Sequence, residues 1–315
     1  MNTGTILVCG EALIDFFPLG RGGLSFEGHP GGSPFNVAIG LARLGAPAAF
    51  FGGLSRDLFG RRLAATLAAE GVSLAHVVES DRSTTLGFVA LTDDGVASYA
   101  FIGEGAADRS LTIADLPVLP ASVEAIHVGS FSTMVEPTGS TLMALIARES
   151  GRRLISFDPN IRPTVVPDIG RWRARIEAAL PHVHLLKISA EDLALVYPGA
   201  DPETVALDWL AAGVRLVVLT EGADGARAWT REVRVSVPGV RVPVVDSVGA
   251  GDSFQAALIE GLREIGALVP SLLGGVGEAP LAGVLGYAAS AAAITCSRRG
   301  ADLPHRSEVE RTAVE

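Results

Sequence analysis

Cysteine is scarce in this chain: its 315 residues include two, Cys9 and Cys296. Two cysteines cannot form a disulfide framework or a cysteine-rich zinc site. Each lies in an apolar or small-residue stretch, so we expect two buried, reduced thiols. Histidine provides no metal site either, because His182 and His184 are the one closely spaced pair among six histidines and no third ligand accompanies them.

Basic residues are outnumbered by acidic ones, 25 to 35, which gives a formal net charge of −10. Without basic clusters, neither nucleic acid nor an anionic membrane is an expected partner. The apolar run at residues 6–9 is too short for a secretory signal, so we expect a cytoplasmic protein. Residues 279–297 carry no charge but consist mostly of Ala and Gly, which favours a buried helix over a membrane span.

Hydrophobic residues make up 48% of the chain, enough for a sizeable core. Short apolar runs alternate with helical stretches between residues 126 and 225, a pattern typical of a parallel sheet. The expected strands cover residues 125–128, 154–157, 185–188 and 216–219, and the expected helices residues 138–150, 171–180 and 202–212. We therefore predict an α/β fold with a doubly wound, mostly parallel sheet and helices on both faces, formed by residues 1–315 as one domain.

Two further patterns lie outside the region of strand–helix alternation. Residues 84–92 and 97–102 alternate between apolar and polar around Asp93-Asp94-Gly95, which predicts a β-hairpin. The residues from about His305 onward are polar, and we expect them to be loose.

Polar and glycine residues near the N-terminus suggest a ligand site. Asp15 follows the first strand inside an apolar stretch, where it either faces solvent or binds a polar ligand such as sugar hydroxyls. Gly31 and Gly32 precede a helix that begins near Pro34 and contains Asn36. Backbone at these glycines can approach a ligand closely, while Asn36 offers a donor and an acceptor.

The stretch at residues 246–254 carries the strongest signal. An apolar run at 241–245 predicts a strand before it, and a helix is expected over 253–262. Gly249, Ala250 and Gly251 leave backbone N–H groups uncovered at a helix N-terminus, which attracts anions. Asp252 is either a helix cap or a base beside a phosphate cradle.

This stretch resembles the second signature of the PfkB, or ribokinase-like, carbohydrate kinases, D-T-x-G-A-G-D-x-F, with Ser247 in place of Thr. The residues that follow Gly31 resemble the family's first signature, G-G-x-x-x-N-x-A. Asp158-x-Asn160-x-Arg162 and the segment from Arg298 to Ala301 are similar to bacterial fructokinases in particular. The resemblance extends from Gly10 to Ala301.

The resemblance implies an ATP-dependent sugar kinase of ribokinase-like fold that uses Mg²⁺, with K⁺ as an optional second ion. A small β-sheet formed by about residues 11–30 and 85–103 would close over the sugar as a lid. Exposed edges of such a sheet make a homodimer through the lid plausible.

The same resemblance implies roles for individual residues. Asp252 would be the base, and the N–H groups of Gly249, Ala250 and Gly251 would stabilise charge on the phosphoryl group, with Arg162 directed toward it. The sugar would contact Asp15, Gly31, Gly32, Asn36, Arg109 and Asp252. The nucleotide would contact Lys187, Ser189, Thr220, Gly222, Gly225, Gly249 and Gly251. Glu191 or Asp192 would hold Mg²⁺ through water, and Asp246 with Ser247 a monovalent cation.

Fructose is the expected sugar, with 2-keto-3-deoxygluconate as the alternative and ribose or a nucleoside less favoured. An acidic sugar requires cationic partners near the lid, and the expected lid segments offer only Arg21. A nicotinamide oxidoreductase is excluded because a single glycine, Gly10, and then Glu11 follow the first strand. A sugar sensor without catalysis is the other class considered, and the intact Gly-Ala-Gly-Asp sequence argues against it.

Overall fold

The computed structural model describes residues 4–19, 24–91 and 97–312. The predicted turn at residues 93–95 and the lid residue Arg21 lie outside these described residues.

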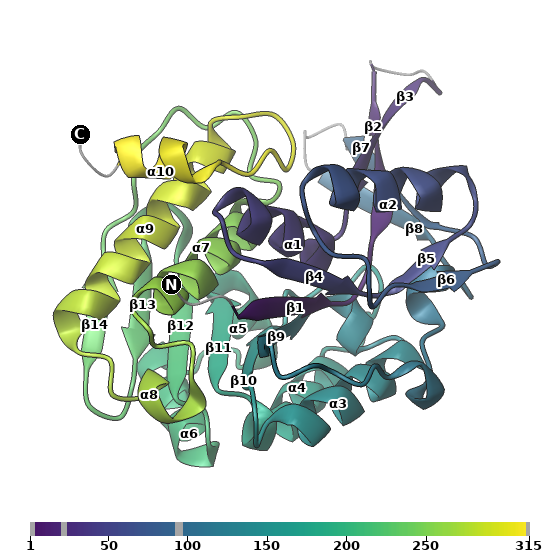
Figure 1. The fold of residues 1–315 in the computed structure, drawn as a ribbon. Helices are drawn as coiled ribbons and strands as arrows, with labels where there is room; N and C mark the ends of the chain where they lie inside the picture. The colour runs from purple at the N-terminus through teal and green to yellow at the C-terminus, as the bar shows by residue number, and fades with distance from the viewer. Residues whose placement is uncertain (1–3, 20–23, 92–96, 313–315) are drawn as a thin grey trace.

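An eight-stranded sheet forms the centre of the molecule, in the order β14-β13-β12-β11-β10-β9-β1-β4 (Figure 1). Within this sheet, β12, β11, β10, β9, β1 and β4 run parallel to one another, and β13 and β14 are each antiparallel to their neighbours. In chain order these strands are β1 (Thr5–Cys9), β4 (Ala48–Phe51), β9 (Val123–Gly129), β10 (Leu154–Asp158), β11 (Leu185–Ser189), β12 (Leu216–Thr220), β13 (Ala226–Trp229) and β14 (Arg234–Val237). The mostly parallel sheet predicted from the strand–helix alternation is confirmed.

Helices cover both faces of this sheet because alternate strand residues point to opposite sides. In β1, for example, Ile6 packs into one core cluster and Leu7 into the other. The first cluster contains residues of α1 (Ser33–Arg43), α2 (Leu58–Ala69), α7 (Ala250–Glu264), α8 (Pro270–Leu273), α9 (Glu278–Cys296) and α10 (Arg306–Thr312). The second contains residues of α3 (Thr138–Glu149), α4 (Ile169–Ala179), α5 (Ala190–Val196) and α6 (Pro202–Ala212).

A smaller four-stranded sheet projects beside α2, at the upper right of Figure 1. Its strands are β2 (Leu13–Pro18), β3 (Phe26–Gly31), β7 (Thr85–Leu91) and β8 (Ala97–Ile102), in the order β3-β2-β7-β8. The antiparallel β7–β8 pair confirms the predicted hairpin, and the two segments expected to form a lid belong to one sheet. The stacked rings of Phe16 and Phe88, 5.0 Å apart, and the ring of Phe59 on α2 fix one face of the small sheet to α2.

The connection that leads to α7 differs from the prediction. Residues 238–248 form no strand, because Pro243 has no N–H for a sheet ladder and Val244 and Val245 are exposed. The N–H of Val245 instead donates to the carbonyl of Cys296 at the end of α9. The helix begins at Ala250, three residues before the predicted start.

The prediction of a loose C-terminus is also wrong for residues 306–312, which form α10. Arg306 of this helix pairs with Glu260 and Glu264 of α7, and its Nε donates to the carbonyl of Leu44 at 2.6 Å. Short β5 (Gly53–Ser55) and β6 (Val78–Ser80) form a separate two-stranded sheet, and brief 3-10 turns include η1 (Ala107–Arg109), η2 (Ile113–Asp115), η3 (Phe131–Thr133), η4 (Leu180–His182) and η5 (Gly222–Asp224).

Among the residues that the structure describes, one helix, α9, is long and apolar enough to cross a membrane by length and composition alone. Its Leu281, Leu285 and Ala288 are completely buried, and it packs along α7. These contacts agree with the prediction of a core helix. Cys9 is buried, whereas Cys296 at the end of α9 is only partly buried.

Candidate active site

The carboxylate of Asp252 is fixed by two side chains from α1. Oδ1 accepts a hydrogen bond of 2.6 Å from the Ser33 hydroxyl, and Oδ2 accepts one of 2.8 Å from the Asn36 amide. Asp252 lies in the first turn of α7 and is 8% exposed. Both recorded bonds lead to another helix, so the carboxylate has a role beyond capping α7.

Burial raises the pKa of Asp252 above the ordinary value of an aspartate, since a charged carboxylate is less favourable away from water. The bonds from Ser33 and Asn36 and the charges of Arg162 and Lys187 oppose this shift without cancelling it. The result is an oriented carboxylate that is more basic than one in water.

Backbone N–H groups lie beside this carboxylate at the start of α7. Gly249 has a φ of +79°, which favours glycine, and a Cβ there would lie 2.7 Å from the Cβ of Ala301. Of the three N–H groups predicted to bind phosphate, that of Ala250 donates to the carbonyl of Ser247 at 3.2 Å. Within the described residues the N–H groups of Gly249 and Gly251 make no such bond, so these two are available to an anion.

Positive charge approaches the same turn from the sheet. Lys187 is buried in the middle of β11, and its Nζ pairs with Asp158 Oδ2 at 2.8 Å. A Cβ on Gly251 would lie 3.4 Å from this Nζ. Arg162 is exposed, and its charge acts on both Asp252 and Asp15. The motif in the sequence assigns no separate role to Asp158, and the structure shows it as the partner that holds Lys187.

The structure distinguishes the two acidic residues proposed for Mg²⁺. Ser189 caps α5 by accepting the N–H of Asp192 at 3.0 Å. Asp192 is half-buried, accepts the N–H of Ile161 at 3.1 Å, and has a pKa raised by burial and by the charge of Asp158. Glu191 is exposed. Asp192 is therefore the acidic side chain that faces Asp158.

No group of three or more His, Cys, Asp or Glu in the described ranges is arranged to hold a metal ion. His184 in particular is occupied, because its Nδ1 accepts the N–H of Ile155 at 2.9 Å. A single half-buried carboxylate such as Asp192 suits Mg²⁺ that keeps most of its ligands as water and substrate phosphate. Asp192 therefore fits Mg²⁺ that arrives bound to the substrate phosphates, rather than Mg²⁺ held by protein ligands alone.

Asp15 lies over two glycines of the small sheet. A Cβ on Gly31 of β3 or on Gly87 of β7 would collide with its carboxylate oxygens. Asp15 is half-buried rather than on a free solvent face, which favours the interpretation as a ligand-binding residue. Gly87 and Ser33 were missed in the sequence, although glycine inside a strand is a known signal of close approach.

Burial raises the pKa of Asp15 from 3.8 to about 6, against the attraction of Arg162 and with a contribution from the charge of Asp252. Between these two pH values the folded chain holds a proton that the unfolded chain has released. The stability that this group contributes is therefore present below about pH 4 and is lost as the pH rises through about 6.

We predict that Asp15→Asn stabilises the ligand-free protein at pH 8, on the order of 2 kcal/mol, with a smaller gain at pH 4.5. We expect the KM of the sugar to rise about tenfold or more, since an ionised acceptor for hydroxyl groups is lost. Denaturant unfolding at both pH values and steady-state kinetics check the two effects. A variant that is less stable than wild type at pH 8 would contradict the account of Asp15.

Gly32 lies directly before α1, and three of the predicted nucleotide residues lie at the turn after β12. Gly32 precedes α1 with a φ of +105°, and a Cβ there would lie 2.9 Å from the carbonyl oxygen of Glu11. Thr220, Gly222 and Gly225 form the turn from β12 to β13 at the carboxyl edge of the sheet. This edge is where ligands bind in open α/β sheets.

Asp246 ties the loop before α7 to the C-terminal segment. Its Oδ1 accepts the N–H of Val248 at 3.0 Å and its Oδ2 the N–H of Gly300 at 2.8 Å, while Ser247 is exposed. The carboxylate therefore has a structural role whether or not a cation binds there.

Arg109 lies beside the small sheet, where a Cβ on Gly103 would be 2.8 Å from its Nη2. Its guanidinium lies 5.1 Å from the centre of the Phe131 ring and lines a cavity of about 330 Å³ together with Arg82 and Glu104. Its Nε and Nη2 are buried without a hydrogen-bond partner. No recorded contact joins Arg109 to Asp252 or Asp15, so its role in sugar binding stays a prediction.

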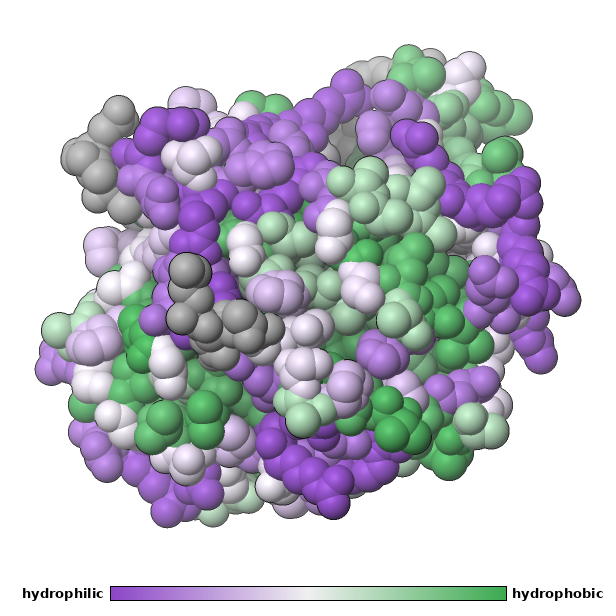
Figure 2. Space-filling view, viewed as in Figure 1, coloured by the Kyte–Doolittle hydropathy of each residue, from purple (hydrophilic) through white to green (hydrophobic). Residues whose placement is uncertain are grey.

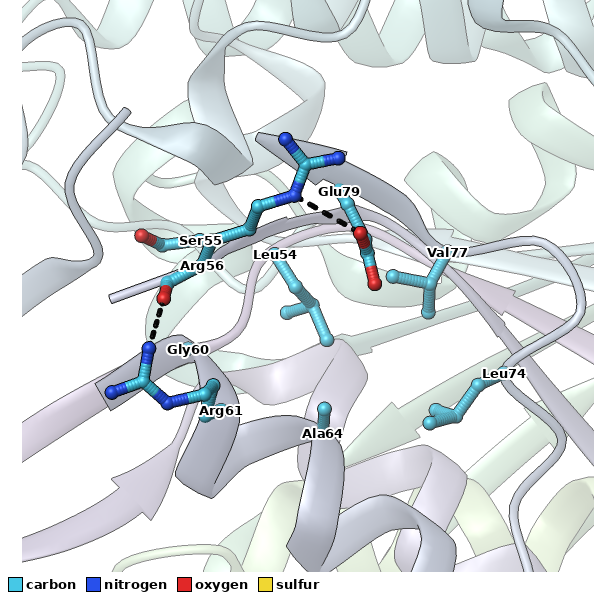
Figure 3. Close-up of a pocket in the computed structure, with 9 residues that line it drawn as sticks. All are labelled: Leu54, Ser55, Arg56, Gly60, Arg61, Ala64, Leu74, Val77 and Glu79. Carbon is cyan, nitrogen blue, oxygen red and sulfur yellow. Dashed lines mark hydrogen bonds and ion pairs between the residues drawn. The ribbon is translucent and has the colours of Figure 1, made fainter. Parts of the chain in front are cut away.

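A cavity of about 500 Å³ lies between α2 and the β5–β6 pair, on the side where Figure 2 shows apolar surface around α2. Leu54, Ala64, Leu74 and Val77 form its apolar wall (Figure 3). The two arginines drawn there are engaged: Arg56 pairs with Glu79 at 3.1 Å, and Arg61 donates to the carbonyl of Arg56 at 2.5 Å. None of the predicted catalytic residues lines this cavity.

Comparison with known proteins gives one consistent group. Residues 4–307 match the pfkB family of carbohydrate kinases. A fructokinase from Rhizobium leguminosarum bv. trifolii is 44% identical over 262 residues, covering 82% of this chain and 79% of that protein. Probable fructokinase-4 from Arabidopsis thaliana is 36% identical over 318 residues, covering 97% and 95%.

Solved structures agree with these relatives. A fructokinase from Xylella fastidiosa with bound ATP has a TM-score of 0.89 at 29% identity, and the match covers 100% of this chain and 99% of the other. A double-mutant fructokinase from Vibrio cholerae O395, bound to fructose, ADP and potassium ion, has a TM-score of 0.86 at 28% identity, with 99% and 98% covered.

Proposed function

This chain belongs to the pfkB family of carbohydrate kinases, and from that premise we propose that it transfers the γ-phosphoryl group of ATP to a primary hydroxyl of fructose. It is a phosphotransferase whose acceptor is a sugar hydroxyl.

The observation that carries this function is the pair of bonds that hold the Asp252 carboxylate beside the uncovered N–H groups of Gly249 and Gly251. Asp252 takes the proton from the sugar hydroxyl while the oxygen of that hydroxyl attacks the γ-phosphorus. The bond from phosphorus to the bridging oxygen breaks, and ADP leaves with that electron pair. The two N–H groups stabilise negative charge on the transferring oxygens.

Charged side chains complete this arrangement. Lys187, held in place by Asp158, and Arg162 supply positive charge for the phosphates. Mg²⁺, when bound with ATP, neutralises phosphate charge, and Asp192 would hold it through water. A monovalent cation such as K⁺ beside Asp246 and Ser247 is a further proposal, which the dependence of kcat on added KCl tests directly.

Fructose is favoured over an acidic sugar by the charges near Asp15. A sugar carboxylate placed there would meet the negative charges of Asp15 and Asp252, and in the described part of the chain Arg162 is the cation whose charge acts on both. The alternative is 2-keto-3-deoxygluconate, which would require the two free nitrogen atoms of Arg109 as well.

The experiment is an ADP-release assay with Mg-ATP against fructose, 2-keto-3-deoxygluconate, ribose and adenosine. Turnover on fructose at a kcat/KM at least about a hundredfold above the other three supports the proposal. Preference for the keto-deoxy acid would keep the mechanism and change the substrate. ATP and sugar binding without any turnover would favour a sensor.

We also propose that the protein is cytoplasmic and forms a homodimer through the small sheet. Strands β3 and β8 are its open edges, and Leu24 and Ile102 beside them are 94% and 64% exposed. We expect sedimentation equilibrium to give twice the chain mass, and Ile102→Lys to shift the protein toward monomer. A wild-type protein that sediments as a monomer at micromolar concentration would refute the dimer.

A further inference from the structure

Beneath the active site, three buried polar residues from three elements are joined in a row. The hydroxyl of Ser156 on β10 lies 3.1 Å from Nδ1 of His127 on β9 and accepts a 2.9 Å bond from Nε2 of Gln255 on α7. All three side chains are at most 1% exposed. We call them the sheet–helix row.

The row lies in an otherwise apolar layer. Ala125 and Leu154 are two residues before His127 and Ser156 on their strands, and both belong to the core cluster that α7 shares. His127 and Ser156 are direct neighbours across the β9–β10 ladder. Apolar residues at these three positions would continue this layer, so the polar side chains are a costly choice unless each is hydrogen-bonded.

A neutral His127 ring allows one continuous set of bonds, in the tautomer that carries its proton on Nε2. Burial and the charge of Lys187 lower the pKa of His127 to about 4, so the ring is neutral at physiological pH. The Ser156 hydroxyl can then donate to Nδ1 while it accepts from Gln255. Gln255 is held in this row by the bond from its Nε2, while its Oε1 is buried without a hydrogen-bond partner among the described residues. The row therefore favours the rotation of Gln255 that keeps the bond to Ser156.

The row is close to the reacting groups along two elements, α7 and β10. Gln255 follows Asp252 by three residues on α7, so the two share a face of the helix. Ser156 precedes Asp158 by two residues on β10, so both point to the same side of the sheet, where Asp158 holds Lys187. The bond from Gln255 to Ser156 therefore connects the first turns of α7 to β10, the strand whose Asp158 pairs with Lys187.

We propose that the sheet–helix row is a positioning network, which sets the rotation and height of the first turn of α7 over β9 and β10. Through it, the Asp252 carboxylate and the N–H groups of Gly249 and Gly251 are aimed at the reacting phosphoryl group. Hydrophobic packing alone fixes a helix less strictly, since apolar contacts are non-directional. The inference rests on the proposed kinase activity for its kinetic readout but not for its structural one.

The kinetic test compares Gln255→Leu and Ser156→Ala with a control variant, Thr141→Val. Thr141 is also buried, and its hydroxyl shares its one hydrogen between the carbonyl oxygens of Leu111 and Pro137, each 3.0 Å away, but it lies on α3 at the opposite face of the sheet. We expect the row variants to lose about 10–100-fold in kcat, with the KM of ATP and of fructose changed less than about threefold. Thr141→Val should lose comparable stability and retain wild-type kcat.

The structural test needs no substrate. Amide hydrogen exchange of residues 249–253 should be faster in Gln255→Leu than in wild type and unchanged in Thr141→Val. Row variants with kcat within twofold of wild type, at a stability loss like that of Thr141→Val, would overturn the proposal. If the wild-type protein shows no turnover on any sugar, the proposed function fails, and the exchange comparison alone decides on the row: equal exchange in the two variants overturns it.

Discussion

Asp252→Asn is expected to lower kcat by about 10²–10⁴-fold, a loss of roughly 3–5 kcal/mol of transition-state stabilisation. The amide keeps the shape of the carboxylate but cannot accept a proton. It can also keep both contacts, because its oxygen accepts from Asn36 and its NH₂ donates to a reoriented Ser33 hydroxyl. The fold and ATP binding should therefore survive the substitution, and the loss should be confined to turnover.

The measurement pairs steady-state kinetics with calorimetric titration of ATP and denaturant unfolding. Asp201→Asn is a matched control, because Asp201 also stands at a helix N-terminus, where it accepts the N–H of Thr204 at 3.0 Å, but it is exposed on α6. Wild-type turnover in Asp252→Asn would remove the assignment of Asp252 as the base.

Local patterns in the sequence were sufficient for β1 and for the strands from β9 to β12, but not for β4, β13 and β14 of the same sheet. Each strand from β9 to β12 is an apolar run bounded by polar or turn residues, and helix α6 begins and ends at the predicted residues 202 and 212. The strand expected at 241–245 is wrong because apolarity alone does not reveal that Pro243 and the exposed valines have no neighbour to pair with. The C-terminal helix was missed because its anchor is long-range: Arg306 reaches Glu260, 46 residues away.

In the candidate site, too, local motifs predict the residues but not the long-range contacts between them. Family motifs in the sequence carry Asp252, Asn36 and Lys187, but not the bonds between them. The sugar contact of Asn36 stays a prediction, and the bond from its amide to Asp252 is seen only in the packing of α1 against α7. The choice between Glu191 and Asp192 depends on the rotation of α5, which the Ser189 cap fixes. No local pattern in the sequence contains that information.

Lys187→Met is expected to damage both stability and catalysis, and the two effects can be separated. Removing one partner of a buried ion pair leaves Asp158 as an isolated buried charge, which costs about 3–5 kcal/mol. Loss of the cation beside Gly251 should also reduce kcat by about 10²-fold or more. The second change Asp158→Asn removes the stranded charge while it keeps an oxygen to accept the N–H of Asn160. The double variant should regain most of the stability and none of the turnover.

Arg153→Met is the matched control for that pair. Arg153 forms a buried ion pair with Glu149, away from the active site on the α3 side of the sheet. Glu149 keeps Arg148 as a second partner, but the substitution also removes the bonds from Arg153 to the carbonyl oxygens of Leu119, Pro120 and Val123. It should therefore cost stability and leave kcat unchanged, as urea unfolding and the ADP-release assay would measure. If the double variant Lys187→Met with Asp158→Asn recovered turnover together with stability, Lys187 would be a structural residue only. The positive charge for the transferring phosphoryl group would then have to come from Arg162 and the metal ion, because Lys187 is the only buried lysine or arginine whose charge is recorded on Asp252 in the described part of the chain.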